Sequence, residues 1–215
     1  MHVAELWRYP VKSLAGEGLT RVEIRADGIL GDRFVHVRGP HGRVVTARTR
    51  PRLLGHRGTL GPDDEALVDA RPWQDPEVRR DIVAAAGPGA RLVRYEGVER
   101  FDVLPLLVAT DGAIQALGVD RRRLRPNIVI AGVPGLSERT WEGRQLRIGN
   151  VVIGVQSLRQ RCVMTTFHPD SLEQDVGVLR KINEEFGGRL ALDCYVVTPG
   201  VVTLGDRVDL MGTRE

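Results

Sequence analysis

The stretch RFVHVRGPHGRVVTAR, residues 33–48, shows the pattern that decides the fold: a short apolar strand, a turn, and a second short strand. The turn lies at Gly39–Gly42, where Gly, Pro and His separate the valines on either side. The same pattern recurs through the first hundred residues. Further strands are predicted over 3–9, around Val22 and Ile24, and over 52–60. Short strands divided by frequent turn signals are typical of a β-barrel or sandwich.

Beyond residue 100 the pattern changes to strands that alternate with helices. A buried strand over 104–109 leads to a helix that begins at Thr110 or Asp111 and ends at Gly118. Two other helices are expected, over 75–86 and over 170–186, the second capped by Asp170 or Ser171. The remaining strands are predicted at 127–131, 144–148, 151–158, 189–197 and 201–210. The sequence therefore predicts a mainly β fold of the α+β class with a few short helices, divided into segments 1–100 and 101–215.

The composition excludes several classes of protein. Of the 215 residues, 42% are hydrophobic and 27% charged, as in ordinary soluble domains. No run approaches the roughly 20 apolar residues that a membrane span needs. The first residues show no basic segment followed by an apolar run, so we expect no secretion signal and a cytoplasmic protein. The net charge of +3 is too small to indicate nucleic-acid binding, and the run Arg121–Arg123 lacks the interleaved aromatic residues that stack on bases.

The cysteine content limits the metal chemistry of the chain. Cys162 and Cys194 are the only two cysteines, too few for a four-thiolate iron–sulfur cluster or a Cys₄ zinc site. The five histidines are scattered without the spacing of metal ligands. The glycine-rich nucleotide loops, HExxH and GxSxG are also missing. We therefore expect neither zinc nor an iron–sulfur cluster in this chain.

Cys162 is the more reactive candidate of the two cysteines. It follows Arg161 directly, and Arg159 lies three positions before it. Cations beside a thiol favour the thiolate, which is a nucleophile and a ligand for soft metals. A buried cysteine that packs as a small hydrophobic residue is the other interpretation, and the residues alone leave it open. Cys194 lies in the strand pattern ALDCYVV, which favours a structural role.

Polar side chains gather where several predicted strands begin or end. Arginine binds phosphate and carboxylate through two N–H groups, lysine adds a point charge, and Asn and Thr add neutral hydrogen bonds. Together such side chains could form an anion pocket, although each alone is typical of a solvated surface group. The clusters are Lys12-Ser13, Asp32-Arg33, Thr46-Ala47-Arg48 and Arg125-Pro126-Asn127.

These pieces occur in one order along the chain. The ordered set comprises Tyr9–Leu14, Gly31–Phe34, Val45–Arg48, Pro51–Leu53, Phe101–Asp102, Pro105–Leu107, Arg125–Ile130, Trp141, Gly143, Ile148–Gly149, Arg161–Cys162, Thr165–Thr166, Phe186–Gly187, Pro199–Gly200 and Gly205–Asp206. It resembles the MOSC superfamily, named for the C-terminal domain of molybdenum cofactor sulfurase. Within that superfamily it is most similar to the group with an N-terminal β-barrel domain, which includes the mitochondrial amidoxime-reducing component. The segment between Leu53 and Phe101 is short for this group, so we expect a trimmed first domain.

The resemblance implies a fold, a cofactor and a site. The fold is a MOSC β-barrel joined to a smaller β-rich N-terminal domain. The cofactor is a molybdenum cofactor of the molybdopterin type, whose metal takes one protein thiolate. Cys162 stands at that position and is implied as metal ligand and catalytic residue. The residues implied to line the pterin and its phosphate are Lys12, Ser13, Arg33, Thr46, Arg48, Thr110, Arg125, Asn127, Gln160 and Arg161.

The implied reaction is the reduction of a small N-hydroxylated compound, with its oxygen atom passing to molybdenum. Electrons would come from a separate donor protein of the ferredoxin, flavin or haem type. Three alternatives remain. Cys162 could carry sulfur as a persulfide to a metal centre or cofactor. The protein could store the cofactor without turnover, or Lys12 could form a Schiff base with pyridoxal phosphate. His168, just past Cys162, could donate a proton or be a solvated loop residue.

Overall fold

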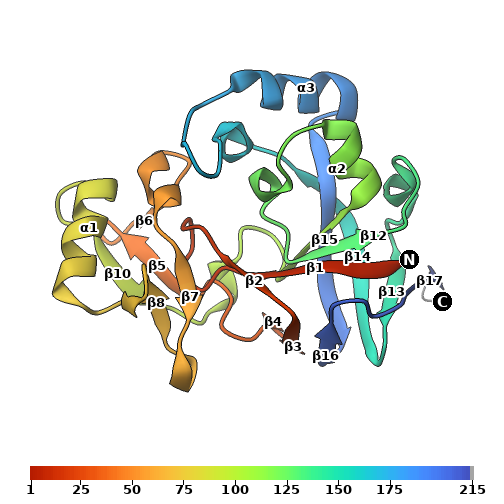
Figure 1. Ribbon diagram of the computed structural model, residues 1–215, viewed down its shortest axis with the longest axis horizontal. Coiled ribbons are helices and arrows are strands. Elements are labelled where there is room, and N and C mark those ends of the chain that lie inside the picture. The colour runs from red at the N-terminus through yellow and green to blue at the C-terminus, as the bar shows by residue number, and fades with distance from the viewer. Residues whose placement is uncertain (214–215) are drawn as a thin grey trace.

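Strands make up most of the regular structure in the computed structural model, which describes residues 1–213 (Figure 1). The strands are β1 His2–Arg8, β2 Glu17–Leu19, β3 Arg21–Arg25, β4 Gly28–Ile29, β5 Val35–Arg38, β6 Val44–Val45, β7 Gly58–Leu60, β8 Ala66–Val68, β9 Arg71–Pro72, β10 Arg91–Arg94, β11 Leu106–Thr110, β12 Ile128–Ala131, β13 Arg144–Ile148, β14 Val151–Gln160, β15 Arg189–Thr198, β16 Gly200–Thr203 and β17 Val208–Thr213. The described residues also form three α-helices: α1 Pro76–Ala86, α2 Asp111–Leu117 and α3 Val176–Phe186. The mainly β, α+β fold predicted from the sequence is confirmed.

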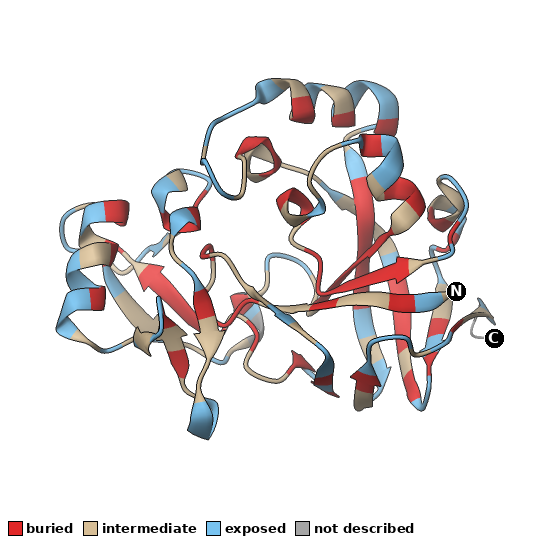
Figure 2. Ribbon diagram, viewed as in Figure 1, coloured by how far each residue is buried: buried red, intermediate tan, exposed pale blue. Residues whose placement is uncertain are grey.

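One large sheet dominates the molecule. Its strand order is β17-β13-β14-β15-β11-β12-β1-β2. Strands β11 and β12 are parallel and are connected through α2, whereas the other neighbouring strands of this sheet pair antiparallel. Apolar side chains from alternate positions of these strands form the main core, in which Leu106, Ile128 and Leu146 are fully buried. Figure 2 shows buried residues along the strands of this sheet, while the helices alternate buried and exposed residues.

The large sheet approaches closure but does not form a closed ladder in the described part of the chain. A bridge joins His2 to Arg207, and Val3 N donates to Asp206 O at 2.9 Å. Further along, the same edge of β1 is taken by β2, which pairs with Leu6–Arg8. β17 therefore meets β1 at one end only. The β-barrel expected from the sequence is therefore not confirmed, because the described residues form no closed ladder.

Three small sheets complete the fold, with orders β10-β5-β6, β16-β3-β4 and β7-β8-β9. The first and third of these lie with α1 at one end of the molecule, and the large sheet lies at the other (Figure 1). Val35, Val68 and Ile82 belong to the core of that first end. β3 pairs with β16, and its Ile24 belongs to the same main core as Leu106. The predicted division near residue 100 stays a prediction, since elements from both segments share this core.

Several local predictions are confirmed. The hairpin around Gly39–Gly42 forms between β5 and β6. α1 begins where expected, because Asp75 Oδ1 accepts a hydrogen bond from Glu77 N at 2.7 Å. α2 is capped by Thr110 and ends at Gly118, whose φ of 73° lies in the left-handed region. Among the described residues, no helix is both long and apolar enough to cross a membrane.

Two local predictions are wrong in part. The strand expected over 52–60 is a 3₁₀ turn at Pro51–Gly55 followed by the short strand β7, because Pro51 begins a turn that buries both Leu53 and Leu54. The helix expected from residue 170 begins only at Val176. Its cap is Asp175, whose Oδ1 accepts from Gly177 N at 2.8 Å, and Asp170 instead pairs with Arg122 at 2.7 Å.

Candidate functional site

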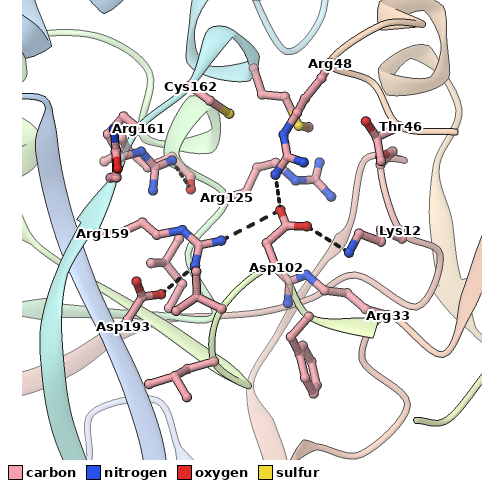
Figure 3. Close-up of a pocket in the computed structure, with 18 of the residues that line it drawn as sticks. Lys12, Arg33, Thr46, Arg48, Asp102, Arg125, Arg159, Arg161, Cys162 and Asp193 are labelled. Atoms are coloured by element: carbon pink, nitrogen blue, oxygen red, sulfur yellow. Dashed lines mark hydrogen bonds and ion pairs between the residues drawn. The ribbon is translucent and has the colours of Figure 1, made fainter. Parts of the chain in front are cut away.

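A cavity of about 350 Å³ lies where segments from the two ends of the molecule meet (Figure 3). From the first end come Lys12 and Ser13 after β1 and Thr46 and Arg48 after β6. From the large sheet come the end of β14 and the loop before β12. Since strand ends leave side chains free of the ladder, they can carry a site without disturbing the core.

The structure brings the predicted site residues together, with one exception. The cavity is lined by Lys12, Ser13, Arg33, Thr46, Arg48, Arg125, Asn127, Gln160, Arg161 and Cys162. Thr110 lies outside it. Its hydroxyl is fully buried, accepts a hydrogen bond from Ala113 N at 3.2 Å and donates to Glu138 Oε2 at 3.2 Å. Thr110 therefore serves helix α2 rather than the cavity.

Three cavity residues hold an unusual backbone conformation. Ser13, Arg33 and Arg125 have φ values of 73°, 56° and 55°, in the left-handed region. For a residue with a side chain this conformation costs roughly 1–2 kcal/mol. Such residues concentrate at functional sites, where the surrounding structure holds them in place. All three lie in turns or loops at the cavity wall rather than within a strand.

Cys162 is half-buried and enters the cavity as a free thiol. Two hydrogen bonds hold the backbone of Cys162 in place, because Cys162 O accepts from Thr165 N at 3.0 Å and from Thr165 Oγ1 at 2.9 Å. Cys194 is fully buried in the large sheet, and burial raises the pKa of its thiol. The two cysteines therefore differ as the sequence predicts: one faces a cavity and the other packs in the core.

Three cations of the cavity lie around the carboxylate of Asp102 (Figure 3). Its Oδ1 lies 2.8 Å from Lys12 Nζ, and its Oδ2 lies 2.5 Å from Arg48 Nη2. Arg159 Nη2 approaches the same Oδ2 at 3.8 Å. Burial opposes ionisation of Asp102, but these three cations outweigh it and lower its pKa. The sequence marked Phe101-Asp102 only as part of the resemblance and missed this role.

A second carboxylate, Asp193, lies at the β15 side of the cavity. Arg159 Nη1 donates to its Oδ1 at 2.7 Å. Burial raises the pKa of Asp193, although Arg159 and Arg161 oppose the shift. Sequence reasoning missed Asp193 because it stands among apolar residues in ALDCYVV, a pattern typical of a core strand.

Arg125 stacks on an aromatic ring instead of pairing with a carboxylate. Its guanidinium carbon lies 4.3 Å from the centroid of the Tyr9 ring, and that of Arg33 lies 4.9 Å from it. Tyr9 is itself fixed, because its hydroxyl donates to Pro126 O at 3.1 Å. Burial lowers the pKa of Arg125 to about 10. Arg125 therefore remains a cation at neutral pH with an unused hydrogen-bonding face.

Comparison with known proteins agrees with this arrangement. The profile of the MOSC N-terminal beta barrel domain matches residues 1–99, and that of the MOSC domain matches residues 108–209. The chain belongs to the MOSC domain family. This MOSC protein is 27% identical over 281 residues to mitochondrial amidoxime-reducing component 1 of Homo sapiens, covering 98% of this chain and 83% of that protein. It is 29% identical over 229 residues to mitochondrial amidoxime reducing component 2 of Homo sapiens, covering 79% of this chain and 67% of that protein.

A solved structure shares the fold of this MOSC protein. The YUAD protein from Bacillus subtilis superposes with a TM-score of 0.50, covering 99% of this chain and 96% of that one. The sequence identity is 14%, so the likeness shows the fold alone.

Asn127 lines the cavity of this MOSC protein, but its side-chain amide hydrogen-bonds to other residues of the protein. Its Oδ1 accepts from Leu107 N at 3.1 Å, and its Nδ2 donates to Asp32 Oδ2 at 3.2 Å. Asn127 Nδ2 also donates to Trp7 O at 3.3 Å. The side chain therefore joins β1, the start of β11 and the Asp32-Arg33 turn, and so positions the cavity wall.

The charges of the cavity suit an anion. Its lining holds more cations than carboxylates: Lys12, Arg33, Arg48, Arg123, Arg125, Arg159 and Arg161 against Asp102 and Asp193. Arg161 Nη2 donates to Leu124 O at 2.7 Å, but its buried Nε has no partner. Burial lowers the pKa of Arg161 to about 10. A phosphate beside these donors and a soft metal beside Cys162 both fit the side chains present.

Proposed function

We propose that this MOSC protein binds a molybdenum cofactor of the molybdopterin type in the cavity and reduces small N-hydroxylated compounds. One observation carries the proposal: the half-buried Cys162 thiol opens into the same cavity as the cluster of lysine and arginine side chains. The names of the amidoxime-reducing relatives support the choice of substrate class.

The chain's own residues would divide the work. Cys162 would supply the protein thiolate to the metal, and Lys12, Arg48 and Arg125 would hold the phosphate of the pterin. Burial lowers the pKa of Arg48, but the neighbouring Asp102 and Cys162 outweigh it, so Arg48 stays charged beside the thiol. When bound, the cofactor would supply two-electron redox chemistry that no side chain of the cavity offers.

The reaction needs protons as well as electrons. Reducing an N–OH group to N–H and water consumes two electrons and two protons. We assign the electrons to a separate donor protein. Asp193 is suited to hand on a proton at its carboxyl group, because burial raises its pKa and it lines the cavity.

The test is the molybdenum and pterin content of protein expressed in a host that makes the cofactor. We expect near-stoichiometric metal and pterin in the wild-type chain and loss of metal in Cys162→Ala. Cys194→Ala is the matched control, because that thiol is fully buried in the sheet and should not affect the metal. Reduction of an N-hydroxylated substrate with a reduced viologen dye then follows metal content across the three proteins.

Absence of both metal and pterin from the wild-type chain would overturn the proposal. The sulfur-carrier alternative predicts that result together with a persulfide on Cys162, detectable as a mass increase of one sulfur atom. Equal metal and activity in Cys162→Ala would instead remove Cys162 from the site.

A further inference from the structure

A second cavity, of about 300 Å³, adjoins the first. Much of its lining is apolar and includes Trp7, Tyr9, Leu54, Met164 and Phe167. Three of these are aromatic, and aromatic faces stack on planar rings. Arg125 and Arg33 already lie over the Tyr9 ring, so Trp7 and Phe167 offer the faces for a ligand. The volume is at the lower end of the range for ligand pockets, which suits a molecule of one or two rings.

The rest of this lining is largely cationic. It includes Arg57, Arg122, Arg123 and Arg125, and its carboxylate is Asp170. Arg122 already takes that carboxylate through two hydrogen bonds, of 2.8 and 2.7 Å. Among the described residues, the other three arginines have no carboxylate within ion-pair distance.

Arg123 is the clearest of these unmatched charges. It is only 9% exposed, and its Nη1 is fixed by Thr165 O at 3.2 Å and Thr166 O at 2.6 Å. Its Nε is buried without a partner. A buried cation without a counter-ion is unfavourable, and an anion bound beside it offsets that cost. The lining therefore favours a ligand that carries a negative charge next to a planar ring.

We propose that the second cavity is a binding site for a small planar aromatic carboxylate. The aromatic side chains would receive the ring, and the unmatched guanidinium groups would bind the carboxylate through pairs of N–H groups. None of this recognition needs a metal or a pterin. The site shares Arg125 with the proposed cofactor cavity, but it does not rest on the proposed function, and either can fail without the other.

The first experiment compares three probes on the purified full chain by isothermal titration calorimetry. Benzoate carries both features, benzamide keeps the ring without the charge, and acetate keeps the charge without the ring. We expect benzoate to bind and the other two to bind at least about tenfold more weakly, since each loses one set of contacts. No detectable benzoate binding, or equal binding of benzoate and benzamide, overturns the proposal.

The second experiment locates the site. Ala15 lines the second cavity but not the first, so Ala15→Phe should fill it and abolish benzoate binding while inorganic phosphate still binds in the first. Ala116→Phe is the matched control, because Ala116 is exposed on α2 outside both cavities. Benzoate binding that survives Ala15→Phe overturns the assignment.

A charge variant keeps the proposal testable if Ala15→Phe does not fold, which circular dichroism would show. Arg57→Gln should weaken benzoate about threefold to tenfold through loss of one cation at the cavity. Arg80→Gln removes the same charge from an exposed position on α1 and should leave the affinity unchanged. Equal affinities in the two variants overturn the proposal.

Discussion

The two cavities share a wall but balance their charges differently. Arg123, Arg125 and Met164 line both. In the first cavity the protein supplies its own carboxylate, because Asp102 lies among three cations. In the second, Asp170 is already taken by a neighbouring arginine. An anion that binds Lys12 or Arg48 in the first cavity must compete with Asp102, whereas one entering the second meets arginines without a carboxylate. Charge compensation, more than volume, therefore distinguishes the two sites.

The largest effect is expected from Arg125→Asn, which removes a cation from the shared wall. Asparagine tolerates the left-handed φ of this position, so the change addresses charge rather than backbone. We expect inorganic phosphate and benzoate each to bind about thirtyfold to a hundredfold more weakly, because hydrogen bonds to a charged group contribute about 1.5–3 kcal/mol. Calorimetry measures both, with Arg147→Asn, an exposed position on β13, as control. Loss at one cavity alone would break the comparison.

The buried side chain of His36 limits the stability of the protein at acid pH, and so the pH range in which the two cavities can be compared. It is buried in β5, and its Nε2 accepts from Arg38 Nε at 2.9 Å, which requires the neutral ring. Burial, with the charges of Arg38 and Lys12, lowers the pKa of His36 to about 4. The unfolded chain binds that proton near pH 6.5, so the stability contributed by His36 is present above pH 6.5 and is lost as the pH falls toward 4.

Between pH 7.5 and pH 5 we expect the free energy of unfolding to fall by about 2 kcal/mol from this group. In His36→Phe the fall should be smaller by that amount. Urea midpoints across the range measure it, with His41→Phe in the exposed turn after β5 as control. The same slope in His36→Phe and wild type would show that another group governs the acid limb.

Asp102→Asn should sharpen the difference between the cavities. It frees Lys12 and Arg48 from their carboxylate, so we expect inorganic phosphate to bind about tenfold more tightly in the first cavity. Benzoate binding in the second cavity should not change. Asp209→Asn, on β17, is the control for net charge. Weaker phosphate binding would mean that Asp102 positions the cations instead of competing for them.

The smallest effect is expected from Lys181→Met, which lies away from both cavities. Lys181 Nζ donates to Ala116 O at 3.1 Å and to Leu117 O at 2.9 Å, at the end of α2. Its loss should lower the free energy of unfolding by about 1 kcal/mol, measured by urea denaturation. Phosphate and benzoate affinities should be those of wild type. A change in either affinity would show that the contact between α3 and the end of α2 affects the cavities.

How far the sequence predicted the fold follows from how local each signal is. The β5–β6 hairpin and the beginning of α1 depend on residues next to one another, and both were predicted. The turn at Pro51–Gly55 buries Leu53 and Leu54 against distant parts of the chain, and α3 begins late where Asp170 pairs with the distant Arg122. Closure of the sheet was overestimated for the same reason, since β2 takes an edge that the pattern of β1 leaves open.

The candidate site divides in the same way. Motifs in chain order pointed to half of the residues that line the cavity, among them Lys12, Arg48 and Cys162. Asp102 and Asp193 were missed because a carboxylate gains its role from cations far along the chain, and no short motif records that contact. The second cavity could not be predicted either, because Trp7, Leu54 and Phe167 resemble ordinary core residues in sequence.

The left-handed backbone of Ser13, Arg33 and Arg125 sets stability and binding against each other. Glycine at Ser13 would relieve strain of roughly 1–2 kcal/mol while removing a side chain from the cavity wall. At Arg33 and Arg125 it would also remove the ion pair with buried Asp32 and the stacking on Tyr9. A screen that selects only for resistance to heat would therefore select glycine at position 13. The selected variants would have higher thermal stability and a lower affinity for anions. Thermal selection of this fold must therefore be coupled to a binding assay.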